Sequence, residues 1–237
     1  MHYRIKLYYL KSIRLIIFCT FFLCAQQGSC LVSFDAAKYV NPFIGTGKYD
    51  GPSRWGHYGG AYPGAVVPFG LVQVSPETRL TGDPLGYYYE DERIYAFSTV
   101  GHMSGYPSGS AGKIKFMPFR STGDDSADYS FFSHDSEIAE PGYYAVDLFE
   151  NSIRVELTAT ERTALIRLQY DDKAPMAVVF SDVDYWDNNG QNAISGKSGG
   201  YYFYILFDQN FKELKNYLVN FDHESDHELR FKIAVSR

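Results

Sequence analysis

The chain has little cysteine, and most of its length has none. Its three cysteines, Cys19, Cys24 and Cys30, all lie within the first 30 of 237 residues. The rest of the chain therefore cannot be cross-linked by disulfides, and a buried core must stabilise it. The six histidines show no zinc spacing. His223 and His227 are four residues apart in a polar stretch without a further ligand, which predicts a surface turn.

Positive charge is also scarce. The chain has 22 basic and 28 acidic residues, a net charge of −6. Residues 1–29 contain four of the basic residues and no acidic one, so without them the net charge is −10. This balance argues against nucleic acid as a partner. A phosphate loop is also lacking, because the glycine-rich stretch 104–112 has no lysine–serine ending and precedes a predicted strand.

The hydrophobic run Leu15–Ala25 is too short to cross a membrane in a helix, which takes about 20 residues. Four basic residues precede it, so residues 1–29 are expected to be a signal peptide. Cleavage after Ala25, a lipoprotein site at Cys30 and a retained anchor remain alternatives. The mature chain is expected to be exported, as a periplasmic, outer-membrane lipoprotein or secreted protein.

Aromatic residues, by contrast, are abundant: they make up 17% of the chain, including 21 tyrosines. This composition favours pleated surfaces. Alternating apolar and polar residues predict strands at 153–157, 166–170 and 229–235. Two wholly apolar runs, 176–180 and 201–207, predict strands covered on both faces. The fold class expected is all-β, as one large antiparallel β-sandwich.

Two shorter segments allow more specific hypotheses. The apolar residues of Phe211–Leu218 are spaced for one helix face and predict one or two helical turns. Three aspartates within 182–187 lie beside Trp186. They fit a sugar or calcium site, because hard cations prefer oxygen ligands, but they also fit a solvated turn that caps a buried strand.

Prolines and glycines punctuate two segments, Val40–Gly47 (VNPFIGTG) and Tyr62–Gly70 (YPGAVVPFG). Each proline removes a backbone donor, and each glycine opens backbone angles that other residues avoid. Neither segment can therefore be helical. Both are expected to form strand ends and tight turns that line an edge or a pocket.

These two segments, continued to Arg79, resemble the N-terminal domain of glycoside hydrolase family 92, a family of calcium-dependent exo-acting α-mannosidases. The resemblance covers about residues 38–237, because further matches follow in the same order. They are Gly86–Tyr89 (GYYY), Phe97–Gly105, Phe132–Tyr144 and Val155–Thr160.

The resemblance implies a β-sandwich of the supersandwich type at 38–237, packed in family members against a larger C-terminal (α/α)6 barrel. That barrel supplies the general acid, the general base and the calcium ligands of the family. No catalytic residue, metal ligand or cofactor is therefore expected in this chain, although calcium is expected in a full-length relative. Leu229–Arg237 resembles the strand that ends the sandwich, so we expect a truncated enzyme, one half of a split enzyme, or a remnant.

The resemblance also suggests which residues bind sugar. Trp55 and His57 lie between the two opening segments, and Tyr87 and His102 lie in segments that face the domain interface in the family. All four are predicted to line a pocket for mannose-containing glycans, with structural packing as the alternative for each. The chain is expected to support an exported α-mannosidase that acts on N-glycan or mannan mannosides. The alternative is a stand-alone carbohydrate-binding β-sandwich without hydrolase activity.

Overall fold

The computed structural model describes residues 35–48, 51, 59–81, 85–103, 112–120, 128–170, 175–222 and 227–237. The predicted signal peptide, residues 1–29, lies outside them and stays a prediction. The chain divides into two units, residues 1–36 and 37–237. One short 3₁₀ helix, η1 (Ala36–Tyr39), begins the described part. No helix among the described residues is long and apolar enough to cross a membrane.

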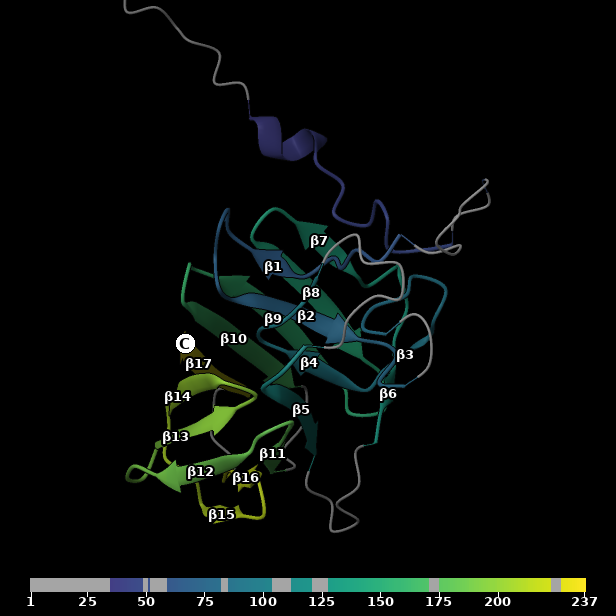
Figure 1. Ribbon diagram of the computed structural model, residues 1–237. Coiled ribbons are helices and arrows are strands. Elements are labelled where there is room, and N and C mark those ends of the chain that lie inside the picture. Colours follow the sequence, from purple (N-terminus) through teal and green to yellow (C-terminus); the bar gives the residue numbers. More distant parts are fainter. Residues whose placement is uncertain are drawn as a thin grey trace, which may run out of the picture. The chain divides into compact units, whose positions relative to one another are not determined.

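The larger unit contains an antiparallel sheet of eight strands in the order β12-β13-β14-β17-β10-β9-β8-β7 (Figure 1). Its strands are β7 (Ile138–Glu140), β8 (Tyr143–Leu148), β9 (Ile153–Ala159), β10 (Thr163–Tyr170), β12 (Tyr185–Asn188), β13 (Ala193–Ser198), β14 (Tyr201–Phe207) and β17 (Glu228–Ser236). Most neighbours in this sheet are joined by tight turns, but β17 inserts between β14 and β10 from the far end of the chain.

A second sheet has seven strands in the order β1-β2-β4-β5-β11-β16-β15, and β3 pairs with β6 in a two-stranded ribbon. Their bounds are β1 (Ala65–Val66), β2 (Gln73–Glu77), β3 (Arg93–Ile94), β4 (Ala96–Ser98), β5 (Lys115–Arg120), β6 (Ser130–Phe131), β11 (Met176–Ser181), β15 (Glu213–Lys215) and β16 (Leu218–Asn220). All pairings are antiparallel, which confirms the predicted all-β antiparallel sandwich.

Phenylalanine rings from both sheets meet in the core. The ring of Phe231 on β17 lies 5.3 Å from that of Phe116 on β5 and 6.3 Å from that of Phe180 on β11. It also lies 5.2 Å from the ring of Phe207 on β14. Such edge-on and tilted ring pairs add to the gain from burying the rings. The core therefore joins the two sheets through aromatic contacts.

The alternating strands were predicted correctly. In β9, β10 and β17 the predicted apolar residues are buried and those between them face outward. The apolar run of β11 is covered on both faces over most of its length, as predicted. The same prediction was wrong for β14, where Tyr202 and Tyr204 are 52% and 44% exposed. Tyrosine has a polar tip and tolerates an outer face, so an apolar run rich in it does not require cover.

The helical turns predicted for Phe211–Leu218 are also wrong. The segment forms a hairpin of β15 and β16, with Lys215 paired to Leu218. Asn216 and Tyr217 at its tip both have positive φ, 49° and 65°. Two successive residues in this region form a turn whose twist matches an antiparallel hairpin. The apolar residues Leu214 and Tyr217 still pack against the core.

Candidate functional site

The first proline–glycine segment forms a compact turn. Asn41 accepts the backbone N–H of Phe43 through its side-chain Oδ1 at 3.0 Å. The Thr46 hydroxyl and backbone N–H both donate to the carbonyl of Phe43, at 2.8 Å and 3.1 Å. Gly45 has a φ of 84°, in the region that favours glycine. The segment is thus held by its own side chains.

Two neighbouring segments fix this turn from either side. The N–H of Ala61 donates to Gly45 O at 3.0 Å, and the N–H of Tyr89 donates to Thr46 O at 3.1 Å. A Cβ at Gly59 would lie 2.1 Å from Gly45 O, so only glycine fits this contact. The ring of Phe43 packs on Tyr89 at 5.6 Å. The turn, which we call the motif turn (residues 41–48), therefore joins residues 59–62 to residues 85–90.

One buried polar cluster is built around Glu77 at the end of β2. Its Oε1 accepts hydrogen bonds from the Ser98 hydroxyl and from the Gly112 N–H, the latter at 2.6 Å. The Ser98 oxygen lies 2.8 Å from Nε2 of His102. Because the Ser98 hydroxyl donates its one proton to Glu77, it accepts the Nε2 proton of His102. The ring of Tyr62 covers His102 at 4.6 Å.

Burial dominates the electrostatics of this cluster. Glu77 is fully buried, and its Oε2 has no hydrogen-bond partner among the described residues. Burial raises the pKa of Glu77 above its ordinary value, although the hydrogen bonds from Ser98 and Gly112 and the nearby Lys115 charge oppose the shift. A Cβ at Gly112 would lie 2.2 Å from Ser98 Oγ, so glycine is required here as well.

A second buried cluster surrounds Glu137, just before β7. The hydroxyls of Tyr87 and Tyr144 donate to its Oε1 at 2.9 Å and 2.5 Å, and Nδ1 of His134 lies 2.6 Å from its Oε2. Burial and the nearby Glu137 charge raise the pKa of both tyrosines, so their hydroxyls stay protonated and keep donating. Tyr89 stacks on His134 with ring centroids 4.0 Å apart.

Several apolar side chains nearby are exposed. On the motif turn, the Ile44 side chain is 74% exposed, and Met103, next to His102, is 53% exposed. Tyr39, Val40 and Tyr89 are exposed too. We call these residues, with the motif turn, the rim. Exposed apolar residues on neighbouring, hydrogen-bonded segments are typical of a surface that another protein part covers.

The four predicted sugar-binding residues fall in three places. Trp55 and His57 lie outside the described residues. Tyr87 is 3% exposed and belongs to the Glu137 cluster, whereas His102 is 6% exposed and belongs to the Glu77 cluster. The motif turn links the two clusters, through Phe43 beside Tyr87 and through Ala61 next to Tyr62. Sugar contact by the four residues stays a prediction.

The sequence interpretation missed both carboxylates. Glu77 follows a proline and precedes a threonine, and Glu137 lies among serine, histidine and aspartate. Such polar surroundings are typical of exposed turns. The one available signal was the tyrosine run Tyr87–Tyr89, since buried tyrosine hydroxyls need acceptors.

The acidic segment after β11 is engaged in packing. Asp182 pairs with Lys115 at 2.6 Å, and Asp184 accepts the N–H of Gly199 at 3.0 Å. Trp186 packs against Phe180 and Tyr217. In the described part of the chain, no three histidine, cysteine, aspartate or glutamate side chains converge as a metal site. Asp182 and Asp184 are thus bonded within the protein, and the sugar or calcium site at this segment stays a hypothesis.

Removing the Tyr87 hydroxyl tests the Glu137 cluster. We expect Tyr87→Phe to lower the free energy of unfolding by about 2 kcal/mol, because a buried carboxylate loses one of its three donors. Urea denaturation followed by tryptophan fluorescence measures the change. Tyr89→Phe, at an exposed ring nearby, should stay within about 0.5 kcal/mol of the wild type. Equal losses in both variants would contradict the assignment.

Comparisons with known proteins point to one family. A model of the glycosyl hydrolase family 92 N-terminal domain matches residues 39–201. An uncharacterized secreted glycosidase from Arthroderma benhamiae is 26% identical over 67% of this chain. The chain spans 21% of that protein's length.

Solved structures of family GH92 enzymes also align with this chain. A family GH92 α-mannosidase from Bacteroides thetaiotaomicron, in complex with mannoimidazole, aligns with a TM-score of 0.67 and 25% identity. The alignment covers 84% of this chain and 32% of that enzyme. A family GH92 inverting mannosidase from the same organism aligns with a TM-score of 0.66 and 22% identity, over 84% and 31% of the two chains. The chain thus spans about a third of these enzymes.

Proposed function

Because the chain belongs to the glycosyl hydrolase family 92 N-terminal domains, we propose that it is the carbohydrate-binding, active-site-supporting domain of an exported α-mannosidase. Its substrates would be mannosides of N-glycans or mannan. The mannosidase structures that align with it support this substrate class, and the secreted relative supports export.

The main observation behind this proposal is the exposed apolar surface of the rim. The motif turn lies between two buried carboxylate clusters and is hydrogen-bonded to segments on both sides, so its position is fixed. Ile44 and Met103 nevertheless point apolar surface outward. We infer that a C-terminal (α/α)6 barrel covers this rim, as in the family. The domain boundaries 38–237 belong to the same proposal.

The chemistry would come from the barrel. Inverting glycosidases need two carboxyl groups about 6.5–9.5 Å apart, with room for a water and the sugar between them. Glu77 and Glu137 are buried and hydrogen-bonded, so neither is offered as the acid or the base. We assign calcium binding to the barrel too. Tyr87 and His102 would hold the loops beneath the sugar, while Trp55 and His57 remain candidates for direct contact.

A reconstitution experiment tests the proposal. The barrel of the Bacteroides mannosidase, produced alone, is mixed with this chain, and calcium-dependent mannose release from 4-nitrophenyl α-mannoside is measured. We expect this chain to raise the release above that of the barrel alone. Ile44→Glu should lower the gain about tenfold, because it places a charge on the covered surface.

Leu165→Glu is the matched control, since Leu165 is also exposed but lies on β10, away from the motif turn in sequence. It should leave the gain unchanged. A complex that forms without any gain in hydrolysis would count against the proposal. Mannoside binding by the chain alone, without such a gain, would favour the stand-alone carbohydrate-binding domain.

A further inference from the structure

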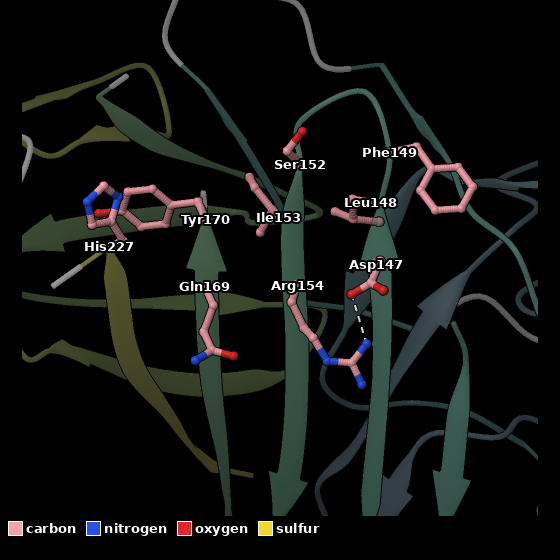
Figure 2. Close-up of a pocket in the computed structure, with 9 residues that line it drawn as sticks. All are labelled: Asp147, Leu148, Phe149, Ser152, Ile153, Arg154, Gln169, Tyr170 and His227. Atoms are coloured by element: carbon pink, nitrogen blue, oxygen red, sulfur yellow. Dashed lines mark hydrogen bonds and ion pairs between the residues drawn. The ribbon is translucent and has the colours of Figure 1, made fainter. Parts of the chain in front are cut away.

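A pocket of about 620 Å³ opens where β8 and β10 end and where β9 and β17 begin (Figure 2). Its volume lies within the range of small-molecule sites, about 300–1,000 Å³. It shares no residue with the rim or with the two carboxylate clusters. We call Asp147, Arg154 and Gln169, which lie on adjacent strands, its polar side, and Phe149, Tyr170 and His227, which lie nearer the strand ends, its apolar side (Figure 2).

The polar side is a row across three adjacent strands. Asp147 pairs with Arg154 in the β8–β9 register, and Arg154 pairs with Gln169 in the β9–β10 register. Paired residues on one face of a sheet have neighbouring side chains. Figure 2 shows the three side chains next to one another. The pocket therefore presents a carboxylate, a guanidinium and an amide, all planar, at strand spacing.

Part of this hydrogen-bonding capacity is used within the protein. Arg154 Nη1 donates to Asp147 Oδ1 at 2.8 Å and to the Ser136 carbonyl at 3.3 Å. These bonds hold the guanidinium in place. Within the described part of the chain, the other Asp147 oxygen and the Gln169 amide make no hydrogen bond, so they remain available to a ligand.

The apolar side is held by backbone contacts. Phe149 is 51% exposed, and its N–H donates to the carbonyl of Phe131 at 3.0 Å. The N–H of Ser152 donates back to Phe149 O at 3.2 Å, which closes the turn. Tyr170 and His227 have ring centroids 6.0 Å apart, and the Tyr170 N–H donates to His227 O at 3.0 Å. These bonds hold the backbone that carries the exposed Phe149 ring, which offers a surface for stacking.

The charges of the pocket select the ligand. Arg154 is already paired with Asp147, so the polar row carries no net charge to attract a phosphate, a carboxylate or a cation. A sugar ring offers hydroxyls to planar polar groups and a C–H face to an aromatic ring. We propose that this pocket binds a neutral sugar ring, as a second carbohydrate site of the chain. The proposed function supplies only the choice of mannosides as first probes.

Saturation-transfer NMR on the full chain tests the proposal. The probes are methyl α-mannoside, methyl α-glucoside and methyl β-galactoside, with glucuronate and inorganic phosphate as charged comparators. We expect millimolar binding of at least one neutral glycoside. Phe149→Ala and Gln169→Ala should each weaken that binding about tenfold, whereas Phe149→Tyr, which keeps the ring, should retain it.

Matched controls separate the pocket from other surfaces. Phe69→Ala removes another exposed phenyl ring, and Gln209→Ala removes another amide, both outside the pocket. Neither should change the affinity, and circular dichroism checks that each variant is folded. The proposal is overturned if no neutral glycoside binds at millimolar concentration, if a charged comparator binds more tightly, or if the pocket variants bind like the wild type.

The rim variant Ile44→Glu distinguishes this proposal from the proposed function. If Ile44→Glu abolishes sugar binding and the pocket variants do not, the pocket inference fails while the proposed function stands. If the pocket variants alone lose binding and reconstitution produces no hydrolysis, the proposed function fails and the pocket inference stands.

Discussion

Glu77→Ala should lower the free energy of unfolding by about 3–5 kcal/mol. The change leaves the buried N–H of Gly112 and the hydroxyl of Ser98 without their acceptor and opens a cavity at a fully buried position. His102 also loses the Ser98 orientation that fixes its Nε2 proton. Urea denaturation at neutral pH measures the loss.

Glu77→Gln separates the role of shape from that of charge. The amide oxygen can accept from Ser98 and Gly112 as the carboxyl oxygen does, so this variant should fold with at most a small loss. A Glu77→Gln variant as unstable as Glu77→Ala would refute this account. It would mean that the negative charge itself is needed.

The wild type and Glu77→Gln should also differ in how their free energy of unfolding depends on pH. The pKa of Glu77 is raised in the folded state above its ordinary value of 4.5, so folding favours the protonated form. This contribution to stability is complete below the unfolded pKa and is lost as pH rises through the folded pKa. The wild type should therefore lose stability relative to Glu77→Gln as pH rises above 4.5. A constant difference between the two across that range would contradict the burial effect.

Phe231→Ala should cost about 3–5 kcal/mol, because Phe231 is the ring at which both sheets meet. Phe231→Leu keeps most of the volume and should cost less, about 1–2 kcal/mol. Thermal and urea denaturation measure both. Tyr204→Ala on the neighbouring strand β14 is the control, since its ring faces outward, and it should change stability by about 0.5 kcal/mol or less. A similar loss in all three variants would contradict a core centred on Phe231.

Long strands could be predicted from the sequence because their pattern repeats. The strands β9, β10 and β17 each have at least three alternating pairs of inward and outward residues. By contrast, β1, β3 and β6 have two residues each, too few to show a period. In addition, β3 and β6 pair with each other although they lie far apart in the sequence. The hairpin of β15 and β16 was mistaken for helix because Phe211, Leu214 and Leu218 are spaced for one helix face, although Leu214 and Leu218 lie on different strands.

The candidate site was less predictable than the fold. Tyr87 and His102 were selected from the sequence, but Glu137, which accepts from Tyr87, and Glu77, which His102 reaches through Ser98, were not. A carboxylate is buried only if several donors converge on it, and those donors come from separate loops and strands. The donors to Glu137 are residues 87, 134 and 144, which only the folded chain brings together. Apart from the tyrosine run Tyr87–Tyr89, the local sequence gives no sign of that convergence.

The position of β17 sets an order of events during synthesis. β14 and β10 flank it in the sheet, yet β17 follows both in the chain. Until residues 228–236 leave the ribosome, the eight-stranded sheet can form only as a three-stranded and a four-stranded piece, each with an open edge. Open edges recruit strands from other chains. The eight-stranded sheet therefore closes only after β17 has been synthesised, and the growing chain is most exposed to aggregation just before that strand emerges.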